Sequence, residues 1–242
     1  IEEILPVKFD LERPSVALII VLDKSGSMGG EKLELAKEAS KAAVDVLQDD
    51  HRIGIVAFDY DHYWPVDLQE ADNREDINRR ISRIIAGGET NIYPALEEAY
   101  AALIDVEAEV KHIILLSDGR SLPEDFESLV LGMDEETITV STVAVGNGAD
   151  RELLANISTW GGGRTYFMED ANRVPQVFTD EAELATQGTL REEPFQPVVL
   201  KEVEAFKGID FSTSPPLLGY VSTLGKETAE ILLESDVEKP IL

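Results

Sequence analysis

The most constraining feature of the sequence is an uninterrupted apolar run, Val-Ala-Leu-Ile-Ile-Val-Leu, at residues 16–22 between Pro14 and Asp23. A strand with one solvated face alternates apolar and polar residues, so a continuous run predicts a strand buried on both faces. Residues 52–58 and 111–117 have the same character. Such strands need helices on both sides of their sheet, and segments with helical periodicity do separate these runs.

The remaining segments fill in an alternating order of strands and helices. We expect helices over residues 31–48, 73–85, 92–106, 123–131, 150–158 and 173–187, and further strands over residues 63–66, 137–145 and 164–168. Pro65 lies in the first of these strands, and proline is tolerated mainly at sheet edges. The predicted fold class is therefore α/β: a Rossmann-like, doubly wound, mostly parallel sheet of about six strands with one antiparallel edge strand and helices on both faces.

The length of the chain, 242 residues, favours one large domain with an appendage. We expect a linker at residues 1–13, the α/β domain at 14–188, and at 189–242 a partly extended tail or the start of a further domain. The last segment contains five prolines, and only residues 228–233 have clear strand character. The absence of an initiator methionine predicts a fragment of a longer protein.

The charge balance narrows the possible partners. The formal net charge is -27, and such a surface repels phosphate backbones and anionic lipid headgroups. We therefore expect no nucleic acid and no direct membrane contact by this fragment, although an acidic surface also simply keeps a protein soluble. There is no cysteine, which excludes disulfides and thiolate metal ligands.

Small polar residues gather where the predicted strands end. Asp23-Lys-Ser-Gly-Ser27 follows the first strand, Ser117-Asp118-Gly119 follows a central one, and Thr90 precedes the helix expected from residue 92. Ligands of open α/β sheets bind at the carboxyl ends of the strands, where the connections diverge. We therefore expect these three segments to meet at one surface cleft.

This set of side chains suits a hard divalent cation. Mg²⁺ takes about six oxygen ligands and keeps several of its waters. Ser25 and Ser27 can offer two hydroxyls from one turn, while Asp23 and Asp118 balance the charge and can hold waters. One coordination position would then be left for an external anionic oxygen.

Together these residues resemble the metal-ion-dependent adhesion site (MIDAS) of von Willebrand factor type A (VWA) domains, over about residues 14–188. The resemblance implies a metal site, for Mg²⁺ or Mn²⁺, at Asp23, Ser25, Ser27, Thr90 and Asp118. It implies that the two serines and the threonine are direct ligands and that the two aspartates act through water. It also implies a protein-binding module in which the metal coordinates an acidic side chain of a partner protein.

Two further features qualify this resemblance. Glu89 departs from the small residue that many relatives have there, and its carboxylate either strengthens metal binding or hinders an acidic ligand. Residues 1–7, 215–221 and 228–233 look like the segments that flank the A domain in large bacterial membrane-anchored proteins with a glutamine-amidotransferase-like domain. That likeness implies a soluble portion of such a bacterial protein.

Other interpretations stay open. The Asp-x-Ser-x-Ser loop alone is also typical of a helix N-cap, and Asp59 and Asp61 fit ordinary hairpin-turn chemistry. A Mg²⁺-dependent phosphotransfer or hydrolase enzyme is one alternative, but Ser25 stands where such an enzyme needs a second carboxylate. We expect no enzyme, and surface or structural roles for the three histidines. A structural VWA domain without a metal-dependent ligand is the remaining alternative.

Overall fold

The computed structural model describes residues 14–118, 120–146 and 148–186, and beyond them residues 190–191, 196–201, 203, 206–207, 220–221, 232–235 and 239–240. The chain divides into two compact units, Ile1–Thr186 and Gln187–Leu242. The expected linker at residues 1–13 lies outside the described residues. Within the described part of the chain, no helix is both long enough and apolar enough to cross a membrane.

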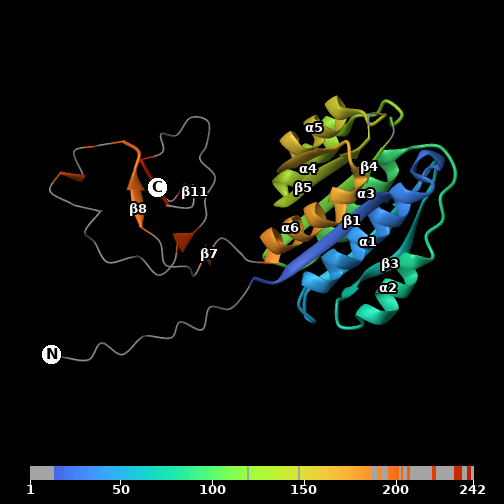
Figure 1. The fold of residues 1–242 in the computed structure, drawn as a ribbon, viewed down its shortest axis with the longest axis horizontal. Helices are drawn as coiled ribbons and strands as arrows, with labels where there is room; N and C mark the ends of the chain where they lie inside the picture. The colour runs from blue at the N-terminus through green and yellow to red at the C-terminus, as the bar shows by residue number, and fades with distance from the viewer. Residues whose placement is uncertain are drawn as a thin grey trace. The chain divides into compact units, whose positions relative to one another are not determined.

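A six-stranded sheet forms the centre of the first unit, in the order β3-β2-β1-β4-β5-β6 (Figure 1). Its strands are β1 (Val16–Asp23), β2 (Arg52–Phe58), β3 (His62–Glu70), β4 (Val110–Ser117), β5 (Ile138–Val145) and β6 (Gly162–Met168). All neighbouring strands pair in parallel except β3, which pairs antiparallel with β2 at the sheet edge. The predicted fold class is confirmed, including the edge strand that contains Pro65.

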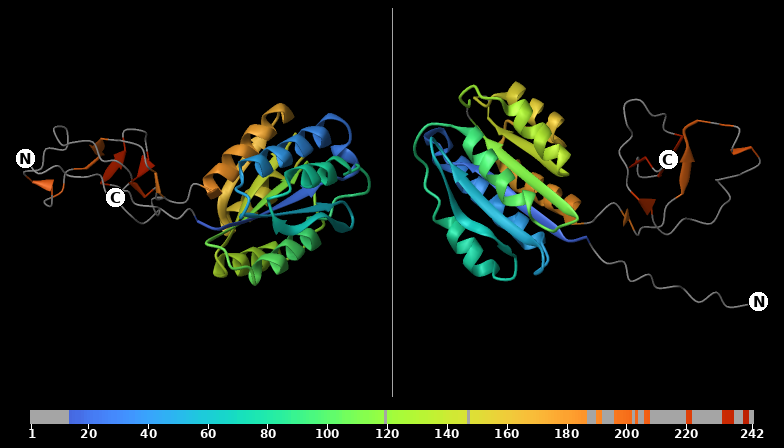
Figure 2. Two further views of the ribbon diagram at one scale, coloured as in Figure 1. Left: turned by 90° about the horizontal axis from the view of Figure 1, so that it is seen from below. Right: turned by 180° about the vertical axis from the view of Figure 1, so that it is seen from behind.

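Helices cover both faces of this sheet (Figure 2). They are α1 (Glu31–Val46), α2 (Arg74–Ser82), α3 (Ile92–Ile104), α4 (Phe126–Glu135), α5 (Arg151–Trp160) and α6 (Val174–Thr186). One buried core lies under α1, α2 and α6, and the other lies under α3, α4 and α5. Alternate side chains of β1 point to opposite cores: Leu18 and Ile20 belong to the first, Ile19 and Val21 to the second. This is why the run at residues 16–22 is apolar throughout.

Most element ends lie within two residues of their predicted positions, and the four exceptions belong to three elements, β3, α4 and α2. The edge strand β3 continues to Glu70, four residues past its predicted end. Helix α4 begins at Phe126 rather than at residue 123, because the Asp125 side chain caps it by accepting a hydrogen bond from Ser128 N at 3.2 Å. It ends at Glu135, four residues past its predicted end. Helix α2 ends at Ser82, so the loop before α3 is longer than predicted.

The second unit contains short antiparallel strands. They are β7 (Leu190–Arg191), β8 (Pro197–Val199), β9 (Tyr220–Val221), β10 (Leu233–Ser235) and β11 (Lys239–Pro240). They form a three-stranded sheet, β11-β10-β8, and a two-stranded sheet, β7-β9. Of the strand predicted at residues 228–233, residues 228–231 lie outside the described residues, and Leu233 begins β10.

Candidate metal site

Four of the five predicted site residues, Asp23, Ser25, Ser27 and Asp118, lie at the carboxyl ends of β1 and β4, the two central strands. Connections leave this point in opposite directions along the sheet, since β2 and β3 lie on one side and β5 and β6 on the other. Such a switch point is where open α/β sheets bind their ligands. Leu22 of β1 is in register with Leu116 of β4, so Asp23 and Ser117 end the two strands side by side.

Asp23 is held by hydrogen bonds on both carboxylate oxygens. Its Oδ1 accepts from Ser25 N at 2.8 Å, and its Oδ2 accepts from Ser117 Oγ at 2.6 Å. Burial raises the pKa of Asp23; the hydrogen bonds from Ser117 and Ser25 oppose that rise, and the charge of Asp118 adds to it. The side chain is therefore a fixed, desolvated carboxylate close to a second acidic group, an environment that a cation would stabilise.

The hydroxyl groups of the loop lie next to one another. A short 3-10 turn, Gly26–Met28, brings Ser27 back toward Ser25, and their Oγ atoms lie 3.0 Å apart. Ser27 Oγ also donates to Asp118 Oδ1 at 2.6 Å. Neighbouring oxygens of an octahedron with a radius of 2.0–2.1 Å are about 2.9 Å apart. The two serine hydroxyls therefore have the spacing that adjacent ligands of Mg²⁺ require.

The loop that carries Thr90 is tied to the same turn by main-chain hydrogen bonds. Gly26 N donates to Gly88 O at 3.0 Å, and Gly87 N donates to Lys24 O at 2.8 Å. Thr90 is half-buried and stands two residues beyond Gly88. The structure therefore brings all three predicted segments to one edge of the sheet.

The two aspartates are more deeply buried than a surface cleft implies. Asp23 is 0% exposed and Asp118 is 3% exposed, because hydrogen-bonded loops close over them, whereas Ser27 faces solvent. Glu89, the departure from the family pattern, is exposed. The expectation of a surface cleft at the aspartates is therefore wrong, and access to the site is at Ser27.

Asp59 makes contacts beyond those of the predicted turn. Its Oδ1 does accept from Asp61 N at 3.0 Å, as in an Asx-type turn. Its Oδ2 also forms an ion pair with Lys24, and its main-chain oxygen accepts from Asn91 N at 2.8 Å. Burial alone would raise the pKa of Asp59, but the hydrogen bond and charge of Lys24 hold it below its usual value. Asp59 thus joins the loops that carry the serines and Thr90.

Sequence reasoning also missed Lys32. Its Nζ forms an ion pair with Asp118 Oδ2 and lies 3.5 Å from the main-chain oxygen of Ser27. The sequence signal that could have identified Lys32 is its place in the first turn of a helix. The helix dipole disfavours a cation there, so a lysine at this position indicates a nearby negative partner. Within the described residues no three His, Asp or Glu side chains gather to hold a metal, so a site here depends on hydroxyl ligands.

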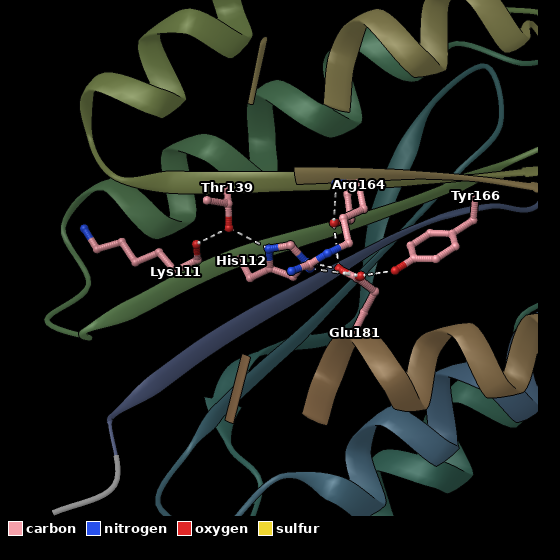
Figure 3. Close-up of polar contacts among 7 residues, drawn as sticks. Lys111, His112, Thr139, Arg164, Tyr166 and Glu181 are labelled. Atoms are coloured by element: carbon pink, nitrogen blue, oxygen red, sulfur yellow. Dashed lines mark hydrogen bonds and ion pairs between the residues drawn. The ribbon is translucent and has the colours of Figure 1, made fainter. Parts of the chain in front are cut away.

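A second polar cluster lies elsewhere in the first unit (Figure 3). Glu181 of α6 accepts hydrogen bonds from Ser141 Oγ at 2.6 Å and Tyr166 OH at 2.5 Å, with His112 Nε2 at 3.2 Å and Arg164 Nη1 at 3.3 Å. These partners belong to β4, β5 and β6, so the cluster fastens α6 to three strands. Its contacts give His112 a structural role.

The sequence and the fold are similar to those of known proteins. The family model of the von Willebrand factor type A domain matches residues 17–180. An uncharacterized protein of Synechocystis sp. is 32% identical over 165 residues, which cover 66% of this chain and 39% of that protein. Escherichia coli YfbK is 28% identical over 179 residues, which cover 70% of this chain and 31% of that protein. The chain thus spans less than two fifths of the length of these two relatives.

Solved structures show the same fold. A von Willebrand factor type A protein from Catenulispora acidiphila has a TM-score of 0.67 at 23% identity, over 77% of this chain and 46% of that one. Proximal thread matrix protein 1 of the mussel byssus, in a structure whose MIDAS motif is occupied by zinc, has a TM-score of 0.61 at 18% identity. That match covers 74% of this chain and 50% of the mussel chain.

Proposed function

The chain belongs to the von Willebrand factor type A family, and from that premise we propose that its first unit is a metal-dependent protein-binding module. Members of this family generally act through contacts with other proteins. In our proposal Ser25, Ser27 and Thr90 hold Mg²⁺ or Mn²⁺ directly, and Asp23 and Asp118 hold its waters. The metal then takes an acidic side chain of the partner.

The observation that carries this proposal is the serine pair. The two hydroxyl oxygens lie 3.0 Å apart, and that of Ser27 is hydrogen-bonded to the buried carboxylate of Asp118. This spacing matches that of adjacent ligands around a small octahedral ion. When bound, the ion would supply a Lewis-acidic position that is open to an external carboxylate oxygen. The zinc reported in the MIDAS motif of the mussel protein supports divalent binding by this type of site.

The surroundings of the site can supply specificity. One metal–carboxylate contact does not make a stable complex, so neighbouring residues must add binding energy. Ile92 N donates to Ser121 Oγ at 2.9 Å, which ties the Thr90 loop to the segment after β4. Tyr60 and Leu122, on loops, and Tyr63, at the start of β3, are exposed apolar side chains around this end of the sheet. We propose residues 59–63, 89–93 and 121–124 as the rim that selects the partner.

Catalysis by this site is the weaker alternative. Ser25 Oγ contacts Ser27 Oγ, and Ser27 Oγ donates to Asp118, so the described hydroxyl contacts include no histidine that could act as a base. His112 contacts Glu181, and His51 directly precedes β2, at the amino ends of the parallel strands and so away from the serines. His62, which opens β3, lies 3.9 Å from Glu98. We therefore propose a binding role rather than an enzymatic one.

The wider assignment belongs to the same proposal. We assign residues 14–188 to the VWA domain and 189–242 to a tail or the start of a further domain. The flanking segments support an origin in a bacterial membrane-anchored protein, of which this chain is a soluble portion.

Thermal unfolding tests the metal site. A ligand at 100 times its dissociation constant adds about 2.7 kcal/mol, and each kcal/mol raises the melting temperature of a domain of this size by roughly 2–4 °C. We expect millimolar Mg²⁺ to raise the melting temperature of a metal-free sample, and Ca²⁺ to act less well because it prefers more numerous ligands. Unchanged melting in Mg²⁺ would refute the site.

Substitution of Asp118 then tests whether the metal binds at the proposed residues. Asp118→Asn keeps the shape of the side chain and its acceptor for Ser27, and it should remove most of the Mg²⁺ response without unfolding the domain. Partner capture from an extract is compared with and without chelator, and with the Asp118→Asn protein. A partner retained equally in all three samples shows that the metal is not the point of capture.

A further inference from the structure

Lys32 places a positive charge inside the proposed metal site. Its ammonium group forms an ion pair with Asp118 Oδ2, while the other oxygen of that carboxylate accepts from Ser27. The Asp118 side chain is 0% exposed and that of Lys32 is 37% exposed. The ion pair therefore joins a buried carboxylate to a partly exposed lysine.

The position of Lys32 in its helix makes this contact informative. Lys32 is the second residue of α1, where the helix dipole disfavours a cation, whereas Glu31 and Glu34 in the same turn are favourably placed. A Cβ on Gly146 would lie 3.6 Å from Lys32 Nζ, so the ammonium group also packs against the loop after β5. The buried charge of Asp118 explains why a lysine is held at this end of the helix.

We propose that Lys32 is an internal counter-ion that competes with divalent metal for Asp118, and so sets the affinity of the site and its selectivity for divalent over monovalent cations. This inference rests on the proposed metal-binding function. Replacing the ammonium group by a monovalent cation leaves the net charge of the site unchanged, whereas replacing it by a divalent cation adds one positive charge. Without metal, Lys32 also relieves the repulsion between the buried carboxylates of Asp118 and Asp23.

The other lysine at this edge shows that the role is specific to Lys32. Lys24 lies within the Asp-x-Ser-x-Ser loop, but its Nζ pairs with Asp59 and lies 5.9 Å from the ring of Tyr63. Its charge is therefore paired with Asp59 of the β2–β3 turn rather than with either of the two proposed metal carboxylates.

The test is calorimetric titration of Mg²⁺ into the whole chain and into its Lys32→Met and Lys32→Arg variants. Lys32→Met should bind Mg²⁺ on the order of tenfold more tightly, because a competing charge is gone. Lys32→Arg, which keeps the charge, should stay close to wild type. Lys41→Met is the matched control: it removes the same charge from α1 about 14 Å further along the helix, and should change affinity little.

Sodium competition separates this role from a purely structural one. Between about 20 and 300 mM NaCl, screening weakens Mg²⁺ binding in every variant. Lys32→Met should lose more affinity than Lys41→Met over this range, since Na⁺ can now occupy the vacated place. Circular dichroism confirms that each variant is folded before titration.

The possible outcomes distinguish this inference from the proposed function. If wild type and Lys32→Met bind Mg²⁺ equally, or Lys32→Met binds more weakly, the counter-ion role is refuted and the metal site stands. If only Lys32→Met binds, the counter-ion role stands and wild type is not a metal-binding module under those conditions. If no variant binds, both proposals fail.

Discussion

Gly88 is the residue on which the approach of the site loops depends. Its φ angle is +79°, a left-handed conformation that side chains other than glycine rarely adopt. A Cβ at this position would lie 2.7 Å from Cγ of Asp59. The main-chain oxygen of Gly88 accepts a hydrogen bond from Gly26 N. Any side chain at residue 88 would therefore push apart Asp59 and the loop that precedes Thr90.

Gly88→Ala should lower both stability and metal response. We expect a loss of roughly 1–3 kcal/mol in the free energy of unfolding, from backbone strain and the clash with Asp59, and a weaker effect of Mg²⁺ on melting. Gly87→Ala is the control, because a Cβ there meets nothing within 4 Å. Chemical denaturation and melting with and without Mg²⁺ measure both effects. Equal behaviour of the two variants would contradict the role of Gly88.

At the scale of elements, α6 is fastened to the sheet by a buried charge. Glu181 is 1% exposed, and its contacts come from β4, β5 and β6. Burial alone would raise the pKa of Glu181, but the hydrogen bond and charge of His112, with hydrogen bonds from Ser141 and Tyr166, hold it at about 2. The carboxylate is thus better stabilised in the folded protein than in water, and α6 has one defined position on β4, β5 and β6.

Glu181→Gln should destabilise the domain by about 3 kcal/mol at neutral pH, the free energy that corresponds to a pKa lowered from 4.5 to about 2. The amide keeps the volume but leaves His112 and Arg164 without a charged acceptor. Glu183→Gln, on the exposed side of the same helix, is the control and should change stability little. Urea denaturation measures both, and a loss below about 1 kcal/mol for Glu181→Gln would count against the cluster.

The same carboxylate predicts a pH dependence. The pKa of Glu181 is lower in the folded state, so its contribution is present above about pH 4.5 and is lost as the pH falls toward 2. The difference in unfolding free energy between wild type and Glu181→Gln should therefore narrow as the pH falls from about 4.5 toward 2. Denaturation curves at several pH values test this, and a difference that does not narrow between about pH 4.5 and 2 would contradict it.

At the scale of the whole molecule, the net charge of -27 opposes an acidic partner at long range. In the proposed function, a metal at the switch point would attract a carboxylate only at contact. Encounter is therefore slowed by the overall charge, while the bound complex depends on the site.

The association rate with such a partner should rise modestly as salt screens this repulsion, at a constant saturating concentration of Mg²⁺. A binder of nucleic acid would show the opposite trend. Surface plasmon resonance over a range of NaCl concentrations measures the rate. A steep fall with added salt would indicate that a local positive patch, rather than the whole charge, governs encounter.

The sequence by itself determined the strands, the fold class and the segments of the candidate site. Buried runs such as residues 16–22 and 111–117, the helical periodicity between them, and the small polar residues at their ends are local patterns. The ends of strands and helices also depend on near neighbours, so their positions are predicted closely except at β3, α2 and α4.

Only the tertiary structure decided which charges meet. Lys32 and Asp118 are 86 residues apart in the sequence, Lys24 and Asp59 are 35 apart, and His112 and Glu181 are 69 apart. These contacts follow from strand order and register, which bring distant residues together and close loops over Asp23 and Asp118. Local patterns do not encode that arrangement, because each pairing depends on how the whole sheet and its helices pack.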